Sequence, residues 1–188
     1  MSLFFQSSMF RLAGLSRRSY DICLSMNILR TVTSKQEVSP ELRKLTSQCG
    51  DSGDGSSRVS YSKDELRQRL TPLEYHCTQE KGTERAFSGK FACFEEEGVF
   101  KCIVCGNPIF SSDAKYNSQS GWPSFTDVID KDRVILKDDT SHGLQRIEVK
   151  CSSCRSHLGH LFDDGPKPTT LRYCINSASL QFKKETTV

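Results

Sequence analysis

The chain has 188 residues with 36% hydrophobic and 26% charged side chains, which fits one folded domain and excludes a wholly disordered protein. Its formal net charge of +3 lies in the N-terminal third, because residues 1–60 contain 8 Lys and Arg against 5 Asp and Glu, while residues 61–188 contain 18 of each kind. Nucleic-acid-binding domains concentrate basic charge on their folded part, and no apolar run here approaches about 18 residues, so we expect neither nucleic acid nor a membrane among the partners.

Residues 1–58 are predicted to be a targeting segment and a flexible linker. Over residues 1–35 the chain is rich in Arg and Ser and contains a single acidic residue, a composition typical of a mitochondrial transit peptide. Residues 50–58 are rich in Gly, Ser and Asp, which predicts a linker. We therefore expect a folded domain over 59–188 and a mitochondrial location, or a cytoplasmic one if translation starts at an internal Met. A tail without a targeting role is the alternative.

Two short helices are predicted at the start of the domain. A Ser three residues before a Glu fits a capping box at 62–65 and predicts a helix over 62–69, which ends before the next Pro. The same signal recurs at 71–74, now with Pro at the first helical position, and predicts a second helix over 71–79.

Beyond Gly82 the helical period disappears, and short strands separated by Gly, Pro, Asn and Asp clusters predict an antiparallel β domain. Residues 144–150 alternate, with Ile147 and Val149 on one side and polar residues, Glu148 among them, on the other. This pattern predicts a half-buried strand. Residues 171–182 are predicted to form one further strand.

Four of the nine cysteines form two matched pairs, Cys102 with Cys105 and Cys151 with Cys154. Two such turns brought face to face supply four thiolates at the corners of a tetrahedron, as Zn²⁺ requires at about 2.3 Å per Zn–S bond. Because 45 residues separate the pairs, the metal would join two distant hairpins. Four thiolate ligands leave no position for water, so we expect one structural zinc.

Two other arrangements of these residues are open. Two reactive Cys-x-x-Cys redox pairs would need a βαβ setting that the sequence lacks. A Cys₂His₂ site of Cys151, Cys154, His157 and His160 would leave the first pair without a role, and its two His lie closer in sequence than a zinc finger provides.

A candidate reactive centre lies near the C-terminus. On a strand of period two, Arg172, Cys174 and Asn176 project from one face. The guanidinium favours the thiolate form of the cysteine, and the Asn amide can donate to an oxyanion. A buried structural cysteine is the alternative.

Residues 121–125 (Gly-Trp-Pro-Ser-Phe), 157–166 and 172–180, together with both cysteine pairs, strongly resemble the B-type methionine sulfoxide reductases. The resemblance covers about 62–182, which is essentially the whole domain. It implies a mainly β fold, a β-tent of two antiparallel sheets with short N-terminal helices and a structural Cys₄ zinc. The implied activity is reduction of the R epimer of methionine sulfoxide in oxidised proteins.

The resemblance also assigns residues. Cys174 matches the catalytic nucleophile, and Trp122 matches the indole that packs on the methyl group of the substrate. The matching polar residues around the substrate sulfur and oxygen are His157, His160, Asp164, Arg172 and Asn176.

Protonation of the sulfoxide oxygen is expected to contribute more to the rate than activation of the thiol. Lowering a thiol pKa from about 8.5 to about 6.5 raises its rate only about 3-fold at neutral pH, because nucleophilicity falls as the thiolate fraction grows. Proton donation by a positioned acid gives about 10²–10⁴. We therefore expect His160 to be the acid, His157 to help bind the oxygen, and Asp164 and Arg172 to orient and polarise, while Cys174 becomes a sulfenic acid. A non-catalytic binding module is the rival hypothesis, and it gives no reason for Arg172, Cys174 and Asn176 to share a face.

Two positions depart from the family pattern. Many members carry a resolving cysteine where this chain has Ser120, and a glycine is usual at Thr170, where only the local loop shape is affected. Recycling must then use either a disulfide to a tail cysteine, Cys49, or direct reduction by an external thiol such as thioredoxin. We expect a monomer.

Overall fold

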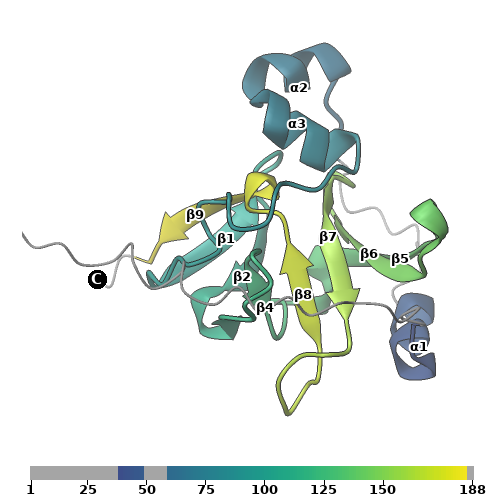
Figure 1. Cartoon of the computed structure of the whole chain (residues 1–188). Coiled ribbons are helices and arrows are strands. Elements are labelled where there is room, and N and C mark those ends of the chain that lie inside the picture. The colour runs from purple at the N-terminus through teal and green to yellow at the C-terminus, as the bar shows by residue number, and fades with distance from the viewer. Residues whose placement is uncertain (1–37, 49–58, 186–188) are drawn as a thin grey trace, which may run out of the picture. The chain divides into compact units, whose positions relative to one another are not determined.

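The structure, a computed structural model, describes residues 38–48 and 59–185 (Figure 1). The helices are α1 (Pro40–Gln48), α2 (Lys63–Arg69) and α3 (Pro72–Gln79). The strands are β1 (Gly98–Cys102), β2 (Pro108–Ser111), β3 (Lys115–Tyr116), β4 (Ser124–Phe125), β5 (Val134–Asp139), β6 (Arg146–Cys151), β7 (His157–Phe162), β8 (Arg172–Ile175) and β9 (Leu180–Lys184). Short 3₁₀ turns are η1 (Ser112–Ala114), η2 (Lys131–Arg133), η3 (Ser141–Gly143) and η4 (Ser177–Ser179).

The strands form two sheets, one with the order β2-β1-β9 and one with the order β3-β4-β8-β7-β6-β5. Every pairing of neighbouring strands is antiparallel. The prediction of a mainly β fold with two antiparallel sheets and short N-terminal helices is confirmed. Figure 1 shows α2 and α3 together at one end of the sheets.

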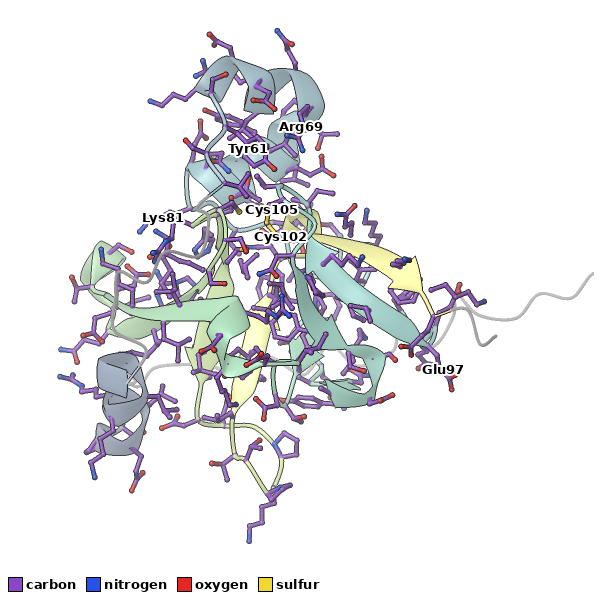
Figure 2. All side chains as sticks on the ribbon, turned by 180° about the vertical axis from the view of Figure 1, so that it is seen from behind. Tyr61, Arg69, Lys81, Glu97, Cys102 and Cys105 are labelled. Carbon is purple, nitrogen blue, oxygen red and sulfur yellow. The ribbon has the colours of Figure 1, made fainter. Side chains whose placement is uncertain are left out.

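Both predicted helices are present at the expected places. The Ser62 hydroxyl accepts the Glu65 N–H at the start of α2, and α3 begins with a complete capping box at Thr71. From α2, Arg69 donates to the carbonyl of Val104 at 2.9 Å, inside the first Cys-x-x-Cys turn. The two helices therefore cover the cysteine pairs, and Figure 2 shows Arg69 above Cys102 and Cys105.

The prediction of a single strand over 171–182 is wrong. The chain leaves the six-stranded sheet at the end of β8, turns through η4 and enters the three-stranded sheet as β9. The buried carboxylate of Glu84 holds this corner, because it accepts the backbone N–H groups of Ser177 at 2.5 Å and Ala178 at 3.0 Å. Asn176 thus lies in the corner and not on the strand.

Aromatic side chains fill the core. Phe110 of β2 and Phe125 of β4 stack at 4.2 Å, and Phe100 of β1 meets Phe125 edge to face at 5.1 Å. Tyr173 of β8 packs edge to face on Phe110 at 5.8 Å. Since neighbouring residues of a strand point to opposite faces, Cys174 projects from the face of β8 opposite to this aromatic core.

β6 is buried on both faces at its centre, so the prediction of a half-buried strand is wrong at one position. Ile147 and Val149 are fully buried as expected, but Glu148 on the other face is only 1% exposed. This carboxylate remains buried because it has polar partners, which are described below.

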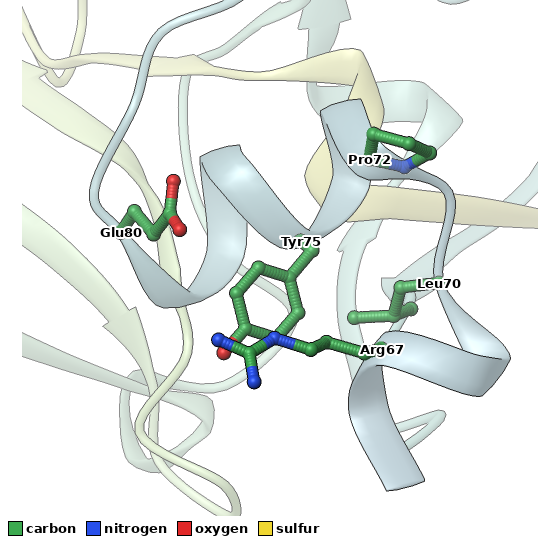
Figure 3. Close-up of a pocket in the computed structure, with 5 residues that line it drawn as sticks. All are labelled: Arg67, Leu70, Pro72, Tyr75 and Glu80. Carbon is green, nitrogen blue, oxygen red and sulfur yellow. The ribbon is translucent and has the colours of Figure 1, made fainter. Parts of the chain in front are cut away.

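The sequence analysis did not predict α1, which packs on β5 with Leu42 buried. The boundary at residue 58 stays a prediction, because residues 1–37 and 49–58 lie outside the described residues. Between α2 and α3 lies a pocket of about 380 Å³, where the guanidinium of Arg67 lies 5.3 Å from the ring centre of Tyr75 (Figure 3). Across the described ranges, no helix combines the length and hydrophobicity needed to cross a membrane.

Candidate active site and metal centre

The two cysteine pairs meet between the sheets. The sulfur atoms of Cys102, Cys105, Cys151 and Cys154 all lie within 4.8 Å of one another, and all four are free thiols. Across the pairs, Cys102 lies 3.6 Å from Cys154, and Cys105 lies 3.6 Å from Cys151. Because Cys102 ends β1 and Cys151 ends β6, this cluster joins the two sheets.

The two turns that carry the cysteines have the same backbone design. The N–H of Gly106 bonds the carbonyl of Cys102, and the N–H of Arg155 bonds the carbonyl of Cys151, both at 2.9 Å. Gly106 and Arg155 both take the left-handed conformation, with φ of 75° and 64°. Left-handed backbone directly after the second cysteine lets each turn close around its two sulfurs.

The geometry of the cluster fits a tetrahedral metal. Metal–sulfur bonds of about 2.3 Å imply sulfur–sulfur separations of about 3.8 Å. The observed 3.6 Å contacts match this value, and Asn107 adds a hydrogen bond to the Cys151 sulfur at 3.5 Å. The four cysteines can therefore hold a metal ion. The Cys₂His₂ alternative is not formed, because His157 and His160 are bonded to carboxylates instead.

A row of polar side chains crosses four strands of the larger sheet. Cys174 of β8 is paired with Ser124 of β4 on one side and with His160 of β7 on the other, and His160 is paired in turn with Glu148 of β6. Directly opposed residues in antiparallel strands project to the same face with Cβ atoms about 5 Å apart. The sheet thus brings the predicted nucleophile and the predicted acid together.

Cys174 is half-buried, and its sulfur lies 4.0 Å from the Ser120 hydroxyl oxygen. Burial raises the pKa of the Cys174 thiol, and the positive charge of Arg172 and the Ser120 hydroxyl oppose this effect only in part. The expectation that Arg172 favours the thiolate is therefore right in sign, but burial prevails. In the free protein this cysteine is a thiol at neutral pH.

Arg172 and Asp164 form a two-pronged ion pair near Cys174. The Nε and Nη2 atoms of Arg172 donate to the two carboxylate oxygens of Asp164 at 2.7 and 2.8 Å. The guanidinium also lies 4.4 Å from the ring centre of Phe162. Such a bidentate pair fixes the direction of the guanidinium beside the thiol.

Trp122 is fixed through its ring nitrogen, which donates to the carbonyl of Glu84 at 3.1 Å. Its backbone N–H donates to the Ser120 hydroxyl at 3.4 Å, so Trp122 belongs to the same short segment that faces Cys174. The indole is partly exposed. A ring held at one end and open at the other is suited to contact a small apolar group.

Asn176 is 3% exposed and bonds only to backbone among the described residues. Its amide nitrogen donates to the carbonyls of Leu158 at 3.3 Å and Gly82 at 3.4 Å, and its oxygen accepts the N–H of Glu84 at 3.1 Å. Asn176 thereby ties the loop of Gly82 and Glu84, which holds Trp122, to the corner after β8.

His160 is bonded to a carboxylate that the sequence analysis missed. Its Nε2 lies 2.8 Å from Asp139 at the end of β5. Burial disfavours the Asp139 carboxylate, but hydrogen bonds from Ser141 and His160 prevail and lower its pKa. Burial lowers the pKa of His160 to about 4, and Asp139 offsets this only in part. The imidazole is therefore neutral near pH 7, with its proton on Nε2.

His157 is bonded to a second missed carboxylate. Its Nδ1 lies 2.9 Å from Glu148, whose other oxygen accepts from Lys81 at 2.8 Å. The rings of His157 and His160 meet edge to face at 5.2 Å. His157 thus lies beside the row that contains Cys174 and His160. Asp139, Glu148 and Lys81 belong to no motif, and the sequence offered a signal only for Glu148, a charge between the apolar Ile147 and Val149.

Comparison with known proteins identifies the family. Residues 70–184 match the SelR domain. The chain is 52% identical over 159 residues to methionine-R-sulfoxide reductase B3, mitochondrial, of Mus musculus, covering 84% of this chain and 62% of that protein. It is 58% identical over 127 residues to peptide methionine sulfoxide reductase MsrB of Methanosarcina barkeri, covering 68% of this chain and 89% of that protein. Methionine-R-sulfoxide reductase B1 of Drosophila melanogaster is 50% identical over 139 residues, covering 68% of this chain and 67% of that protein. The chain therefore belongs to the SelR-domain family, the B-type methionine sulfoxide reductases.

Proposed function

We propose that this chain reduces the R epimer of methionine sulfoxide in oxidised proteins to methionine, with Cys174 as the nucleophile. The observation that carries the proposal is the cross-strand row, in which Cys174 lies beside His160. Ser120 and Arg172 lie beside the same thiol, and the backbone N–H of Trp122 bonds to the Ser120 hydroxyl. A binding module would not need a half-buried thiol opposite an imidazole.

The reaction transfers one oxygen atom to Cys174. An S–O bond forms on the cysteine sulfur and the S–O bond of the sulfoxide breaks, so the cysteine is oxidised by two electrons and the sulfoxide is reduced by two. The thiol proton ends on the transferred oxygen, which gives a sulfenic acid on Cys174 and a methionine residue in the substrate protein. The step therefore needs no proton from the solvent.

Before the reaction, the protonation states of Cys174 and His160 match this proton transfer. The Cys174 thiol carries the proton, because burial raises its pKa, and His160 is neutral. Asp139 occupies Nε2 of His160, which leaves Nδ1 to take the proton from the thiol and deliver it to the sulfoxide oxygen. His160 thus becomes the acid only when the thiol reacts. Proton donation of this kind is worth about 10²–10⁴ in rate.

The other predicted residues bind the substrate or hold the reacting groups in place. Trp122 packs on the methyl group of the substrate, and Arg172, directed by Asp164, stabilises the thiolate as it forms. Asn176 acts as a positioning residue, because all of its described hydrogen bonds go to backbone. The predicted oxyanion contact of Asn176 is not part of this proposal.

The four-cysteine cluster binds one Zn²⁺ in this proposal. Thiolate sulfur is a preferred zinc ligand, and the sulfur–sulfur contacts fit its tetrahedral geometry. With Cys102, Cys105, Cys151 and Cys154 as ligands, the ion has no open position and takes no part in catalysis. It holds β1 and β6, and with them the two sheets, together.

The sulfenic acid is reduced directly by an external thiol such as thioredoxin. The external thiol forms a mixed disulfide with Cys174 and releases water, and a second thiol then frees Cys174. Among the described residues, the free thiols outside the metal cluster are Cys77 and Cys174. Cys77 is fully buried in α3, and burial raises its pKa to about 11, so it is inert. Cys49 lies outside the described residues, and a disulfide to it is the alternative outcome.

Replacing Ser120 with cysteine should open an internal route. The Ser120 oxygen lies 4.0 Å from the Cys174 sulfur, so small rotations about two Cα–Cβ bonds would bring the sulfur of the introduced cysteine to bonding distance. After one equivalent of methionine-R-sulfoxide, Ser120→Cys should form a disulfide between the introduced cysteine and Cys174, with loss of two thiol hydrogens that leave as water with the sulfoxide oxygen. The wild type should instead give a dimedone-trapped sulfenic acid on Cys174. Mass spectrometry of the peptides measures both, with Ser120→Ala as the control. A Cys174–Cys49 disulfide in the wild type would contradict direct reduction.

We also propose a mitochondrial location, an N-terminal segment 1–58 that precedes a catalytic domain 59–188, and a monomeric enzyme. The name of the mouse relative includes the word mitochondrial, and the Arg- and Ser-rich composition of residues 1–35 agrees with it. Imaging of a tagged full-length chain, and mass determination of the mature protein, test the location and the cleavage site.

The function is tested with the two epimers of a dabsylated methionine sulfoxide and dithiothreitol as the reductant. A rigid pocket that holds the methyl group on Trp122 and the oxygen near His160 presents the sulfur to Cys174 in one hand only. The wild type should reduce the R epimer and leave the S epimer intact. Equal turnover of both epimers, or of neither, would contradict the proposal.

A further inference from the structure

Glu148 is a buried carboxylate for which the proposed reaction has no direct use. It is 1% exposed and lies in the same cross-strand row as Cys174 and His160, one strand beyond His160. A lone buried charge would be strongly destabilising. It persists here because one oxygen faces His157 Nδ1 at 2.9 Å and the other accepts from Lys81 Nζ at 2.8 Å.

Lys81 reaches this carboxylate from the loop after α3 (Figure 2). Its backbone takes the left-handed conformation, with φ of 57°, which is unfavourable for a residue with a side chain. Burial disfavours the Glu148 carboxylate, but the hydrogen bonds from His157 and Lys81 prevail and lower its pKa to about 2. Glu148 is therefore ionised at neutral pH and can only accept hydrogen bonds.

An ionised Glu148 decides which nitrogen of His157 carries the proton. Since the carboxylate cannot donate, Nδ1 must be the N–H atom, and in a neutral ring Nε2 is then an acceptor. Nε2 is fully buried and has no hydrogen-bond partner within the described part of the chain. A buried acceptor without a partner points to a group that arrives later.

We propose that Glu148, oriented by Lys81, is a positioning residue that holds His157 Nε2 as the acceptor for the hydroxyl formed when the sulfoxide oxygen is protonated. This inference rests on the proposed function, since it names a role within the same site. His157 lies next to His160, which delivers that proton, with ring centres 5.2 Å apart.

The hydrogen bond to His157 Nε2 should affect kcat but not KM. The sulfoxide oxygen in the bound substrate has no hydrogen and cannot donate to Nε2. The hydrogen bond to His157 exists only once the oxygen has gained its proton, so it stabilises the transition state and not the bound substrate. Loss of the arrangement should therefore lower kcat and leave KM unchanged.

Glu148→Gln should move the proton of His157 from Nδ1 to Nε2. Lys81 only donates, so it draws the amide oxygen of the new side chain to itself and turns the NH₂ group toward His157. Nδ1 must then become the acceptor, and Nε2 gains the proton. We expect kcat to fall by about 10- to 100-fold with KM within about 2-fold, the range found for carboxylates that orient metal-bound histidines.

Lys81→Met provides the rescue. Alone it should lower the Tm, because the buried carboxylate loses one of its two partners, but His157 should keep its proton on Nδ1, because the carboxylate can still accept from it. Combined with Glu148→Gln it frees the amide to turn its oxygen back to Nδ1, so the double variant should have a higher kcat than Glu148→Gln alone. If the Lys81–Glu148 pair served only to stabilise the fold, the double variant should instead have a lower kcat than Glu148→Gln alone. The matched control is Glu96→Gln, which breaks an exposed pair with Lys184 and should change nothing.

Nitrogen-15 NMR of labelled histidine shows which ring nitrogen of His157 carries the proton, without any measurement of turnover. The wild type should show His157 protonated on Nδ1, with the signal assigned by its loss in His157→Gln, and Glu148→Gln should show it on Nε2. A wild-type His157 protonated on Nε2 overturns the inference even if Glu148→Gln does not fold. It is also overturned if Glu148→Gln keeps full kcat, or if Lys81→Met does not raise kcat in the Glu148→Gln background. If the wild type fails to reduce the R epimer, the proposed function fails while the NMR result still stands.

Discussion

A Cys102→Ser variant should fail to fold at room temperature. Apparent free energies of structural zinc binding are about 10–16 kcal/mol, as large as the whole stability of a typical domain at about 5–15 kcal/mol. Cys102 is fully buried at the end of β1, and the cluster joins this strand to β6 of the other sheet. Loss of one ligand therefore removes both the metal and the link between the sheets. Far-UV circular dichroism and the zinc content of the purified protein measure the effect.

Cys77→Ser is the matched control, because Cys77 is equally buried but lies outside the metal cluster. Placing a hydroxyl there costs about 1–3 kcal/mol at most, so this variant should keep its fold, with a lower Tm, and bind one zinc per chain. Treatment of the wild type with a strong chelator should reproduce the Cys102→Ser phenotype. A Cys102→Ser protein that stays folded and active without metal would show that the cluster is not a structural zinc site.

The cysteine pairs and the helix starts could be predicted because their signals are local. A capping box involves residues three apart, and each Cys-x-x-Cys turn closes through a hydrogen bond over four residues. The family motifs around Trp122, His160 and Cys174 are contiguous in sequence in the same way. Such features depend little on the rest of the fold.

The buried carboxylates could not be predicted, because their partners are brought together by the sheet. Lys81 and Glu148 are 67 positions apart, and His160 and Asp139 are 21 apart. Alternation in β6 placed Glu148 on the correct face, but nothing in the strand itself indicates that this face is covered.

The corner after β8 was missed for a similar reason. Its residues contain no Gly or Pro to signal a turn, and the carboxylate of Glu84 that holds it comes from 93 positions away. The predicted strand over 171–182 therefore ran straight through this corner and placed Asn176 beside Cys174. In the structure Asn176 instead connects the corner to the loop that holds Trp122.

Cys174→Ser should abolish reduction of methionine-R-sulfoxide. The sulfur of cysteine can take up the oxygen as a sulfenic acid, but a serine oxygen would have to form a peroxide, for which the reaction supplies no driving force. Loss of a covalent nucleophile costs on the order of 10⁶ in kcat in other enzymes, so only the uncatalysed reaction with dithiothreitol should remain.

Cys174→Ser should leave the fold unchanged, so that its loss of activity can be assigned to the missing thiol and not to unfolding. Serine has nearly the shape of cysteine, and the hydroxyl would meet Ser120, whose oxygen already lies 4.0 Å from the sulfur. The variant should therefore match the wild type in Tm and zinc content, and the Cys77→Ser control should retain turnover and form the dimedone adduct on Cys174. The decisive comparison is the rate with the R epimer under identical reductant. If Cys174→Ser reduced it at a rate near that of the wild type, the nucleophile would be another group, and the cross-strand row of Cys174 and His160 would lose its proposed role.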